Sequence, residues 1–285
     1  MNKIRIVTDS ASDIPQGFKP NVTVLPMTIR FGDTEYQDGV NLTTKQFYEK
    51  LIESDELPAT SLVSPGAFEA AFKEAVNNGE KVVAITMSSN LSGTHQSAVL
   101  AAEEYSEDVF VVDSKSVAVG EHLLVLEALK LIEEGLTAKD IAETIDAEKK
   151  RLHVLAALDT MEYLKKGGRI SSTVAFVGEA LKFKPVVALV DGKVEMKGKA
   201  RGSKNVNNYL VKEIETVGVD FTKPICLGFA GLSDVLLQKY IEDSEQLWTG
   251  HKENIKITPI GATIGTHIGP GAIGVAFIAN EQKKI

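Results

Sequence analysis

The chain has 285 residues, a length typical of one large domain or two ordinary ones, and we expect two. Hydrophobic residues make up 44% and charged residues 25%, which is the composition of a folded globular protein and excludes a disordered or fibrous chain. The 31 Lys and Arg against 39 Asp and Glu give a net charge of -8, which argues against nucleic acid as a partner.

The sequence contains no segment that predicts membrane insertion or export. A membrane span needs about 20 consecutive apolar residues, and the longest comparable run, residues 272–279, is much shorter. The first ten residues alternate as a strand does and lack the apolar core of a signal peptide. We therefore expect a cytoplasmic protein without stable membrane insertion. Cys226 is the only cysteine, which excludes disulfides and cysteine-based metal sites, and its apolar surroundings predict a buried thiol.

The first half of the chain alternates strand and helix patterns. Short β-branched runs at residues 4–8, 82–87, 109–112 and 154–158 predict a parallel sheet covered by helices. Helix starts are indicated by a capping box at Thr43 and Gln46, by Ser64 before Pro65, and by Thr137. Between the first strand and the capping box, residues 22–30 and 34–37 predict a hairpin that turns at Gly32 and Asp33.

The second half has a different pattern, which predicts an α+β layer. We expect a short helix from Asp159 to Gly167, a hairpin turning at Asp191 and Gly192, and further elements as follows: helices over 173–183, 205–217 and 233–246, and strands over 186–190, 194–199, 225–229, 255–260 and 273–278. The expected fold is therefore α/β with two domains, residues 1–157 around a parallel sheet and residues 158–285 as α+β. Because no flexible linker separates them, the domains should pack along a shared cleft.

Three polar segments could hold a ligand. Residues 86–94 form a Ser- and Thr-rich loop between a strand and a helix, where hydroxyls and free amides can bind an anion or simply cap the helix. Residues 59–65 add further hydroxyls before another helix. The glycine-dense segment 259–271 predicts a turn that carries His267 and lets the backbone approach a ligand closely, although a lone histidine is often structural.

Several familiar motifs are excluded by their context. Residues 269–274 match a dinucleotide fingerprint formally, but a strand follows where that motif needs a helix. Asp9 and Asp13 resemble an aspartyl-phosphate loop, except that Ala11 stands where its second Asp belongs. No nucleophile elbow, phosphate-binding P-loop or zinc-protease motif occurs. We therefore expect no cofactor and no metal.

One stretch of this acidic chain is strongly basic. This stretch contains ten lysines and arginines but only three acidic residues, Glu179, Asp191 and Glu195. The basic residues are Lys165, Lys166, Arg169, Lys182, Lys184, Lys193, Lys197, Lys199, Arg201 and Lys204. Scattered lysines usually form a solvated rim. Arg169 and Arg201 lie beside glycines, where a guanidinium can be presented to a phosphate or a carboxylate.

Together these segments resemble the DegV family of bacterial fatty-acid-binding proteins. The resemblance runs in family order along the chain, through residues 7–10, 60–61, 89–94, 113–114, 164–170 and 264–271. It implies a two-domain fold with a lipid tunnel between the domains. It also implies a long-chain fatty acid as ligand and a separate ATP-dependent fatty acid kinase subunit as partner. The carrier would present the acyl carboxylate to that subunit, and the acyl group would leave as acyl phosphate for phospholipid synthesis.

The resemblance also implies roles for individual residues. The carboxylate site corresponds to Thr60 or Ser61, Ser92, the Gly93 amide and His267, while Arg169 and Arg201 correspond to basic residues facing the kinase. Leu62 and Val63 replace a Gln-Pro pair of many relatives, so the choice between Thr60 and Ser61 stays open. Apolar residues at helical spacing are candidates for the tunnel wall, although core packing explains such residues more often: Phe176, Val177, Leu181, Phe183 and Ile264.

Elementary energetics agree with a lipid carrier. A buried carboxylate needs hydrogen-bond donors in place of water, and an acyl chain gains about 0.8 kcal/mol for each CH₂ that it buries. The alternative is a serine-dependent acyl hydrolase or transferase, with Ser92 as nucleophile and His267 as base. No acidic residue lies near His267 in the sequence to orient its ring, so we expect a carrier without catalytic activity of its own.

Overall fold

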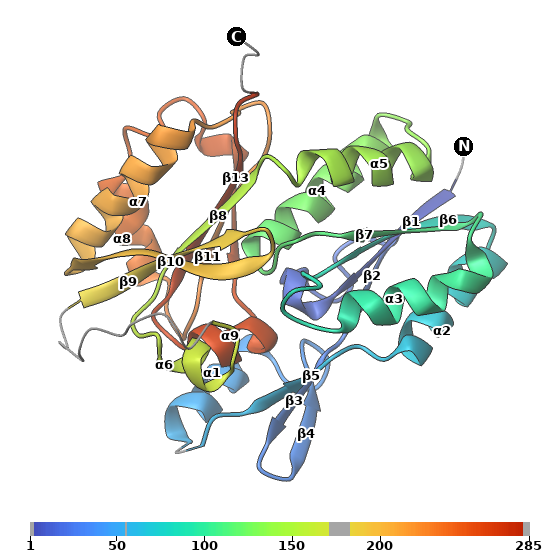
Figure 1. Ribbon diagram of the computed structural model, residues 1–285, viewed down its shortest axis with the longest axis horizontal. Coiled ribbons are helices and arrows are strands. Elements are labelled where there is room, and N and C mark those ends of the chain that lie inside the picture. The colour runs from blue at the N-terminus through green and yellow to red at the C-terminus, as the bar shows by residue number, and fades with distance from the viewer. Residues whose placement is uncertain (1–2, 55, 171–182, 282–285) are drawn as a thin grey trace.

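The structure is a computed structural model that describes residues 3–54, 56–170 and 183–281. Two large sheets lie side by side, and a small third sheet lies below the space between them in the view of Figure 1. The first half of the chain forms the parallel sheet and the second half forms most of a mixed sheet, which confirms the predicted α/β architecture. None of the helices in the described ranges is long and apolar enough to cross a membrane.

The parallel sheet has the strand order β2-β1-β6-β7 and is covered by helices on both faces. Its strands are β1 (Lys3–Asp9), β2 (Val22–Leu25), β6 (Glu80–Thr86) and β7 (Val109–Asp113). Alternate residues of β6 face opposite layers: Val82 packs with α2 (Pro65–Asn77) and α3 (Thr94–Ala102), whereas Val83 packs with α4 (Val119–Glu133) and α5 (Ala138–Glu148). The side chains of Ser64 and Thr137 cap α2 and α5 as the sequence predicts.

The second sheet has six strands in the order β10-β9-β8-β13-β11-β12. They are β8 (Leu152–Ala157), β9 (Phe183–Val190), β10 (Lys193–Arg201), β11 (Ile225–Phe229), β12 (Ile255–Pro259) and β13 (Ile273–Ile278). Helices α7 (Ser203–Val217) and α8 (Val235–Asp243) cover one face, and α4 packs against the other. Because α4 also packs on the parallel sheet, it lies between the two sheets and is buried on nearly every side (Figure 1).

The strand over residues 154–158 belongs to a different sheet from the one expected. The sequence groups it with the first-half strands, but β8 pairs antiparallel with β13 and β9. The chain therefore enters the second sheet at Leu152, where β8 begins. Composition could not reveal this, because an apolar strand fits either sheet equally well.

The expected hairpin over 22–37 is only partly correct. Residues 28–37 form it as β3 (Thr28–Phe31) and β4 (Thr34–Gln37), but β2 pairs with β1 in the parallel sheet. A third strand, β5 (Ala59–Ser61), joins β3 to complete the small sheet, in the order β4-β3-β5. The helix α1 (Thr44–Glu53) follows β4 and begins with the predicted capping box.

Shorter helices complete the described chain. They are η1 (Ser10–Ser12), η2 (Glu103–Tyr105), α6 (Glu162–Lys166), η3 (Lys252–Asn254) and α9 (Ala262–Ile268). The short helix before Gly167 and the hairpin at Asp191 and Gly192 are confirmed as α6 and as the β9–β10 turn. The helix predicted over 173–183 lies outside the described residues, except that Phe183 begins β9. Cys226 is fully buried, as expected.

Within the glycine-dense segment 259–271, residues Ala262–Ile268 form the helix α9 rather than the predicted turn, and glycines of the segment approach aromatic rings. A Cβ at Gly265 would lie 2.6 Å from the Tyr48 hydroxyl and 2.7 Å from the Phe47 ring, both of α1. A Cβ at Gly269 would lie 2.3 Å from the ring of Tyr163 in α6. Glycine therefore lets α9 pack between α1 and α6 at close range.

We expect Gly265→Ala to lower the free energy of unfolding by about 1–3 kcal/mol, because the added methyl overlaps two buried rings. Gly66→Ala is the matched control: Gly66 is an exposed helical glycine of α2 with open space around it, and its replacement should gain about 0.5 kcal/mol. Urea unfolding of both variants measures the difference. Equal stabilities would show that α9 has room at Gly265.

Candidate functional site

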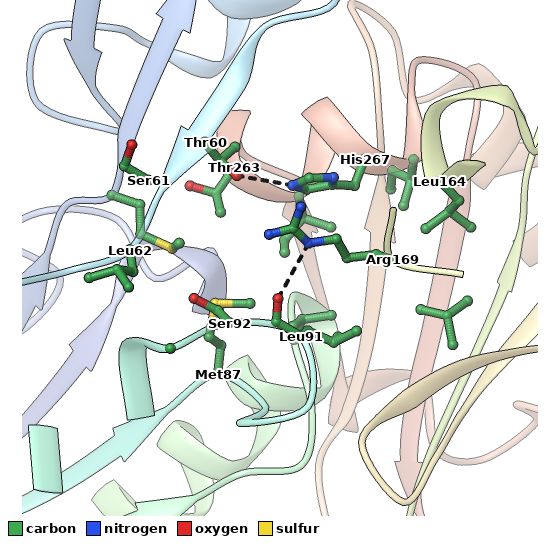
Figure 2. Close-up of a pocket in the computed structure, with 16 residues that line it drawn as sticks. Thr60, Ser61, Leu62, Met87, Leu91, Ser92, Leu164, Arg169, Thr263 and His267 are labelled. Carbon is green, nitrogen blue, oxygen red and sulfur yellow. Dashed lines mark hydrogen bonds between the residues drawn. The ribbon is translucent and has the colours of Figure 1, made fainter. Parts of the chain in front are cut away.

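A cavity of about 380 Å³ lies where the two large sheets and the small sheet meet. This volume falls within the usual range of small-molecule sites, about 300–1,000 Å³. Figure 2 shows side chains from both halves of the chain around it. Its lining comprises Met27, Thr60, Ser61, Leu62, Met87, Leu91, Ser92, Gly93, Val117, Leu164, Arg169, Val194, Thr263, Ile264, His267 and Ile268.

Polar groups from distant segments meet at one part of this cavity. Thr60 of β5 and His267 of α9 share a hydrogen bond of 3.1 Å between Oγ1 and Nε2, although 207 positions separate them. In Figure 2 the side chain of Thr60 turns toward the imidazole, whereas the hydroxyl of Ser61 points away from it. This follows from strand geometry, which directs successive side chains to opposite faces.

The imidazole of His267 is neutral at physiological pH. Burial, and then the positive charge of Arg169, lower the pKa of His267 from its usual 6.5 to about 4. Its Nδ1 is buried and has no hydrogen-bond partner among the described residues. Nδ1 faces the Cα of Gly167, where a Cβ would lie 2.3 Å away. Glycine at the end of α6 thus leaves room for the ring, and Nε2 is the nitrogen that meets Thr60.

The loop over residues 88–93 supplies Ser92 and Gly93. The hydroxyl of Ser92 accepts a 3.2 Å hydrogen bond from the Thr94 amide and lies 2.9 Å from the Thr94 hydroxyl. Helix α3 begins after Gly93 without a side-chain cap, in contrast to α1, α2 and α5. The positive end of its dipole therefore lies at the cavity, where it would favour an anion.

Arg169 connects the second half of the chain to the same loop. Its Nε donates to the carbonyl of Leu91 at 3.4 Å (Figure 2), and its Nη1 donates to the carbonyl of Gly167 at 2.6 Å. The guanidinium lies close enough to His267 to depress its pKa. Arg169 thus adds a fixed positive charge beside Thr60 and His267.

The turn of the β9–β10 hairpin accepts hydrogen bonds from the loop over residues 88–93. Ser88 donates to the carbonyl of Gly192 at 2.8 Å, and Asn90 donates to the carbonyl of Asp191 at 2.6 Å. Asp191 and Gly192 both have positive φ, at 48° and 76°, as a tight two-residue hairpin turn requires. The Asp-Gly pair indicates the turn in the sequence, but no sequence pattern indicates what the turn contacts.

The other predicted site residues are distributed differently. Ile264 lines the cavity, as does Ser61. Arg201 is exposed at the end of β10, opposite Phe183 in the strand register. Phe183 is 44% exposed, lies under the ammonium group of Lys199 and does not line the cavity. Phe176, Val177 and Leu181 lie outside the described residues.

Three lysines of the basic stretch form ion pairs with acidic side chains: Lys166 with Glu162, Lys184 with Asp159, and Lys197 with Glu195.

Sequence reasoning missed much of the lining and two residues behind it. Met27, Met87, Leu91, Val117, Leu164, Val194, Thr263 and Ile268 also line the cavity. Asp13 and Asp38 lie behind α9 and accept hydrogen bonds from its first backbone amides. Met87 could have been found from its place at the carboxyl end of a parallel strand, where ligands usually bind. In the described part of the chain, no group of three or more His, Cys, Asp or Glu side chains is arranged to hold a metal ion.

These features define an α/β protein with a cavity between its sheets, in which hydroxyls, an imidazole and a helix N-terminus meet apolar walls. The chain matches the DegV family, described as uncharacterised proteins, over residues 3–280, and it belongs to that family. A DegV domain-containing protein of Clostridium perfringens is 33% identical over 281 residues, which cover 98% of this chain and 99% of the relative.

Solved structures of the family share the fold. A DegV family protein from Thermus thermophilus, whose structure describes fatty acid binding, is 31% identical with a TM-score of 0.87 over 98% of this chain and 100% of that one. The Fatty Acid Kinase (Fak) B3 protein of Streptococcus pneumoniae, solved with linoleic acid, is 25% identical with a TM-score of 0.86 over 98% of this chain and 100% of that one. The predicted family and fold are thereby confirmed.

We expect Gly192→Ala to destabilise the protein more than Gly32→Ala, by about 1 kcal/mol or more. Both glycines have positive φ in hairpin turns, so both variants carry the same kind of backbone strain. Only at Gly192 does the new Cβ collide, 2.4 Å from the buried Ser88 hydroxyl, whereas Gly32 has open space. Urea unfolding of the pair isolates the docking of the hairpin. Equal losses would show that the turn holds the loop only weakly.

Proposed function

We propose that this protein binds a long-chain fatty acid in the cavity, with the carboxylate at Thr60, Ser92, Gly93 and His267. The observation that carries the proposal is the meeting of hydroxyls, an imidazole and a helix N-terminus at one cavity that is otherwise lined by Met, Leu, Val and Ile side chains. An anion with a long apolar tail fits both halves of this description. The fatty-acid-binding relative from T. thermophilus supports the same ligand.

The hydrogen bond between Thr60 and His267 allows a neutral imidazole to help bind an anion. If Nε2 carries the ring proton, it donates to Thr60 Oγ1, and the Thr60 hydroxyl proton is then free to point at a carboxylate oxygen. Since a hydroxyl both donates and accepts, Thr60 passes the polarity of the ring on to the ligand. A carboxylate at this position would in turn raise the low pKa of His267.

The apolar walls supply the driving force. Each CH₂ of an acyl chain contributes about 0.8 kcal/mol on burial, so a long chain supplies on the order of 10 kcal/mol against the cost of association. Met27 and Met87 are unbranched and flexible, and such side chains adapt to acyl chains of different shape.

The competing reading, a serine hydrolase, needs Ser92 and His267 to work as a pair. The Ser92 hydroxyl interacts with Thr94 and the imidazole Nε2 with Thr60, and no hydrogen bond joins Ser92 to His267 in the described structure. We therefore propose a carrier without catalytic activity of its own. Stoichiometric labelling of Ser92 by a covalent serine probe would contradict this.

We expect Thr60→Val to weaken fatty acid binding about tenfold or more, because the carboxylate loses a hydroxyl donor while side-chain volume is kept. Ser61→Ala is the matched control and should bind as the native protein does, because its hydroxyl points away from His267 (Figure 2). Titration of delipidated protein with palmitate, read by native mass spectrometry, measures both. A larger loss in Ser61→Ala would move the contact to Ser61, and a native protein that takes up no fatty acid would end the proposal.

We further propose that the bound carboxylate is offered to a separate ATP-dependent fatty acid kinase subunit, which forms acyl phosphate for phospholipid synthesis. The similarity to the S. pneumoniae Fak B3 protein supports this. Exposed Arg201 and the positive charge of Arg169 beside the cavity would face the kinase and its phosphate. Because such a kinase draws on ATP, we place the protein in the cytoplasm.

We expect Arg201→Ala to leave fatty acid affinity unchanged and to slow acyl phosphate formation at least tenfold. Arg201 lies outside the cavity lining, so its loss should affect only the encounter with the kinase. The assay combines loaded carrier, a purified bacterial fatty acid kinase and ATP, and follows acyl phosphate by hydroxylamine trapping. Lys256→Ala, on β12 at the opposite edge of the sheet, is the control for loss of a cation. Equal slowing in both variants would show that the loss of any surface cation slows the reaction, and it would contradict a specific role for Arg201.

A further inference from the structure

Helix α9 is held at its N-terminus by a buried carboxylate from the other half of the chain. One oxygen of Asp38 accepts from the Ala262 amide at 3.3 Å. The other accepts from the Thr263 amide at 2.9 Å and from the Thr263 hydroxyl at 2.6 Å. Asp38 is only 4% exposed, so these bonds take the place of its hydration.

A helix of this length needs such support. Helix α9 has seven residues, fewer than two full turns, and isolated helices that short are not stable in water. It carries His267 in its last turn, so whatever fixes its first turn also fixes where the imidazole lies. Asp13 adds one bond to the first turn, at 2.7 Å from the Gly261 amide.

Both ends of α9 are attached to the same small sheet. Asp38 directly follows β4 at one edge of that sheet, and Thr60 lies on β5 at the other edge. Asp38 is itself fixed, because its amide donates to the Met27 carbonyl at 3.0 Å. Helix α9 also contacts β3 and β5, so it lies across the sheet with His267 brought to Thr60.

We propose that Asp38 is a positioning residue for the proposed carboxylate site, which consists of Thr60, Ser92, Gly93 and His267. By anchoring the first turn of α9 to the small sheet, Asp38 sets the hydrogen bond between His267 and Thr60. The inference rests on the proposed function for its ligand, because that bond is the one that would prepare Thr60 for a carboxylate. Asp38 itself does not line the cavity. Its influence on binding is therefore exerted through α9.

The arrangement requires a carboxylate rather than an amide. Asp38 uses both oxygens as acceptors, and all three of its α9 partners are donors. An asparagine would offer one oxygen and turn its NH₂ group toward at least one backbone N–H, so at least one bond would be lost. Asp38→Asn thus loosens the first turn of α9 while hardly changing side-chain volume.

The test compares Asp38→Asn with native protein by two measurements. First, NMR of the ring nitrogens reports the tautomer and hydrogen bonding of His267 without any ligand, and we expect these resonances to shift in the variant. Second, affinities are measured for palmitate and for hexadecanol, which share the same chain. We expect palmitate to bind about tenfold more weakly to the variant and hexadecanol to change less than twofold, since only the carboxylate depends on the prepared Thr60.

Glu121→Gln is the matched control. Glu121 is also a fully buried acid, but it accepts a hydrogen bond from Thr8 of β1 rather than from α9. It should alter neither the His267 resonances nor the ratio of the two affinities. If Asp38→Asn leaves the His267 resonances unchanged, or weakens palmitate and hexadecanol equally, Asp38 has only a structural role and the inference is wrong.

The two proposals fail in different ways. If native protein binds no palmitate, the proposed function fails, while a shift of the His267 resonances in Asp38→Asn still reports the anchoring. Should Asp38→Asn not fold, Thr263→Ala removes the 2.6 Å bond to the carboxylate and the 3.2 Å contact with the Ser10 hydroxyl but keeps the backbone bond. Because Thr263 also lines the cavity, the His267 resonances measured without ligand decide this test: they should shift in the variant, and unchanged resonances would overturn the inference.

Discussion

The site depends on the attachment of α9 to segments from the other end of the chain. Besides the two carboxylates at its N-terminus, the Tyr48 hydroxyl donates to the Ile260 carbonyl at 3.0 Å, and Gly265 packs on the same ring. Each of these contacts joins residues more than 200 positions apart. Thr60 and His267 come together only after the two halves have folded against each other, so the candidate site depends on both halves of the chain.

Buried acids of the first half of the chain and His267 make the stability of the fold depend on pH in opposite directions. Burial, opposed in part by hydrogen bonds from backbone amides, raises the pKa of Asp9 to about 6, and the pKa values of Asp13 and Asp38 are also raised by burial. A carboxyl whose folded-state pKa is raised stabilises the fold less as the pH rises through that pKa. His267 behaves oppositely: its pKa is lowered, so protonation of the unfolded chain removes stability as the pH falls from about 6.5 to about 4.

Local sequence chemistry predicts the elements of this fold well and their long-range partners poorly. The caps of α1, α2 and α5 and the turn at Asp191 and Gly192 are found where the residues indicate them, because such features depend on near neighbours. The sheet to which β8 belongs depends on pairing with a strand far along the chain, and no local pattern contains that information.

In the candidate site, too, the sequence indicates some residues, and only the folded structure reveals the others. Ser92, Gly93, Thr60 and His267 can be proposed from polar loops and from a family resemblance, and all four line one cavity. Asp38 could not be proposed, because it lies in an unremarkable turn after an exposed strand, and only the folded chain brings it to α9. The glycines of residues 261–271 misled the interpretation for a related reason: glycine indicates a close approach but not what approaches, and here aromatic rings do.

The electrostatics of the cavity show which groups favour an anion. His267 lies in the last turn of α9, where the helix dipole is negative and opposes a carboxylate, and the acids behind its first turn add no attraction. The favourable field comes instead from the opposite wall, where α3 begins at Gly93 without a side-chain cap, and from the guanidinium of Arg169. Under the proposed function, His267 would therefore contribute a neutral hydrogen bond, and the charge of a bound carboxylate would be balanced across the cavity by groups that α9 does not supply. The position of α9 would then decide whether the hydrogen bond and the field act on the same atom, and through it the proposed anchor Asp38, which lies outside the cavity, would control the selection of a carboxylate within it.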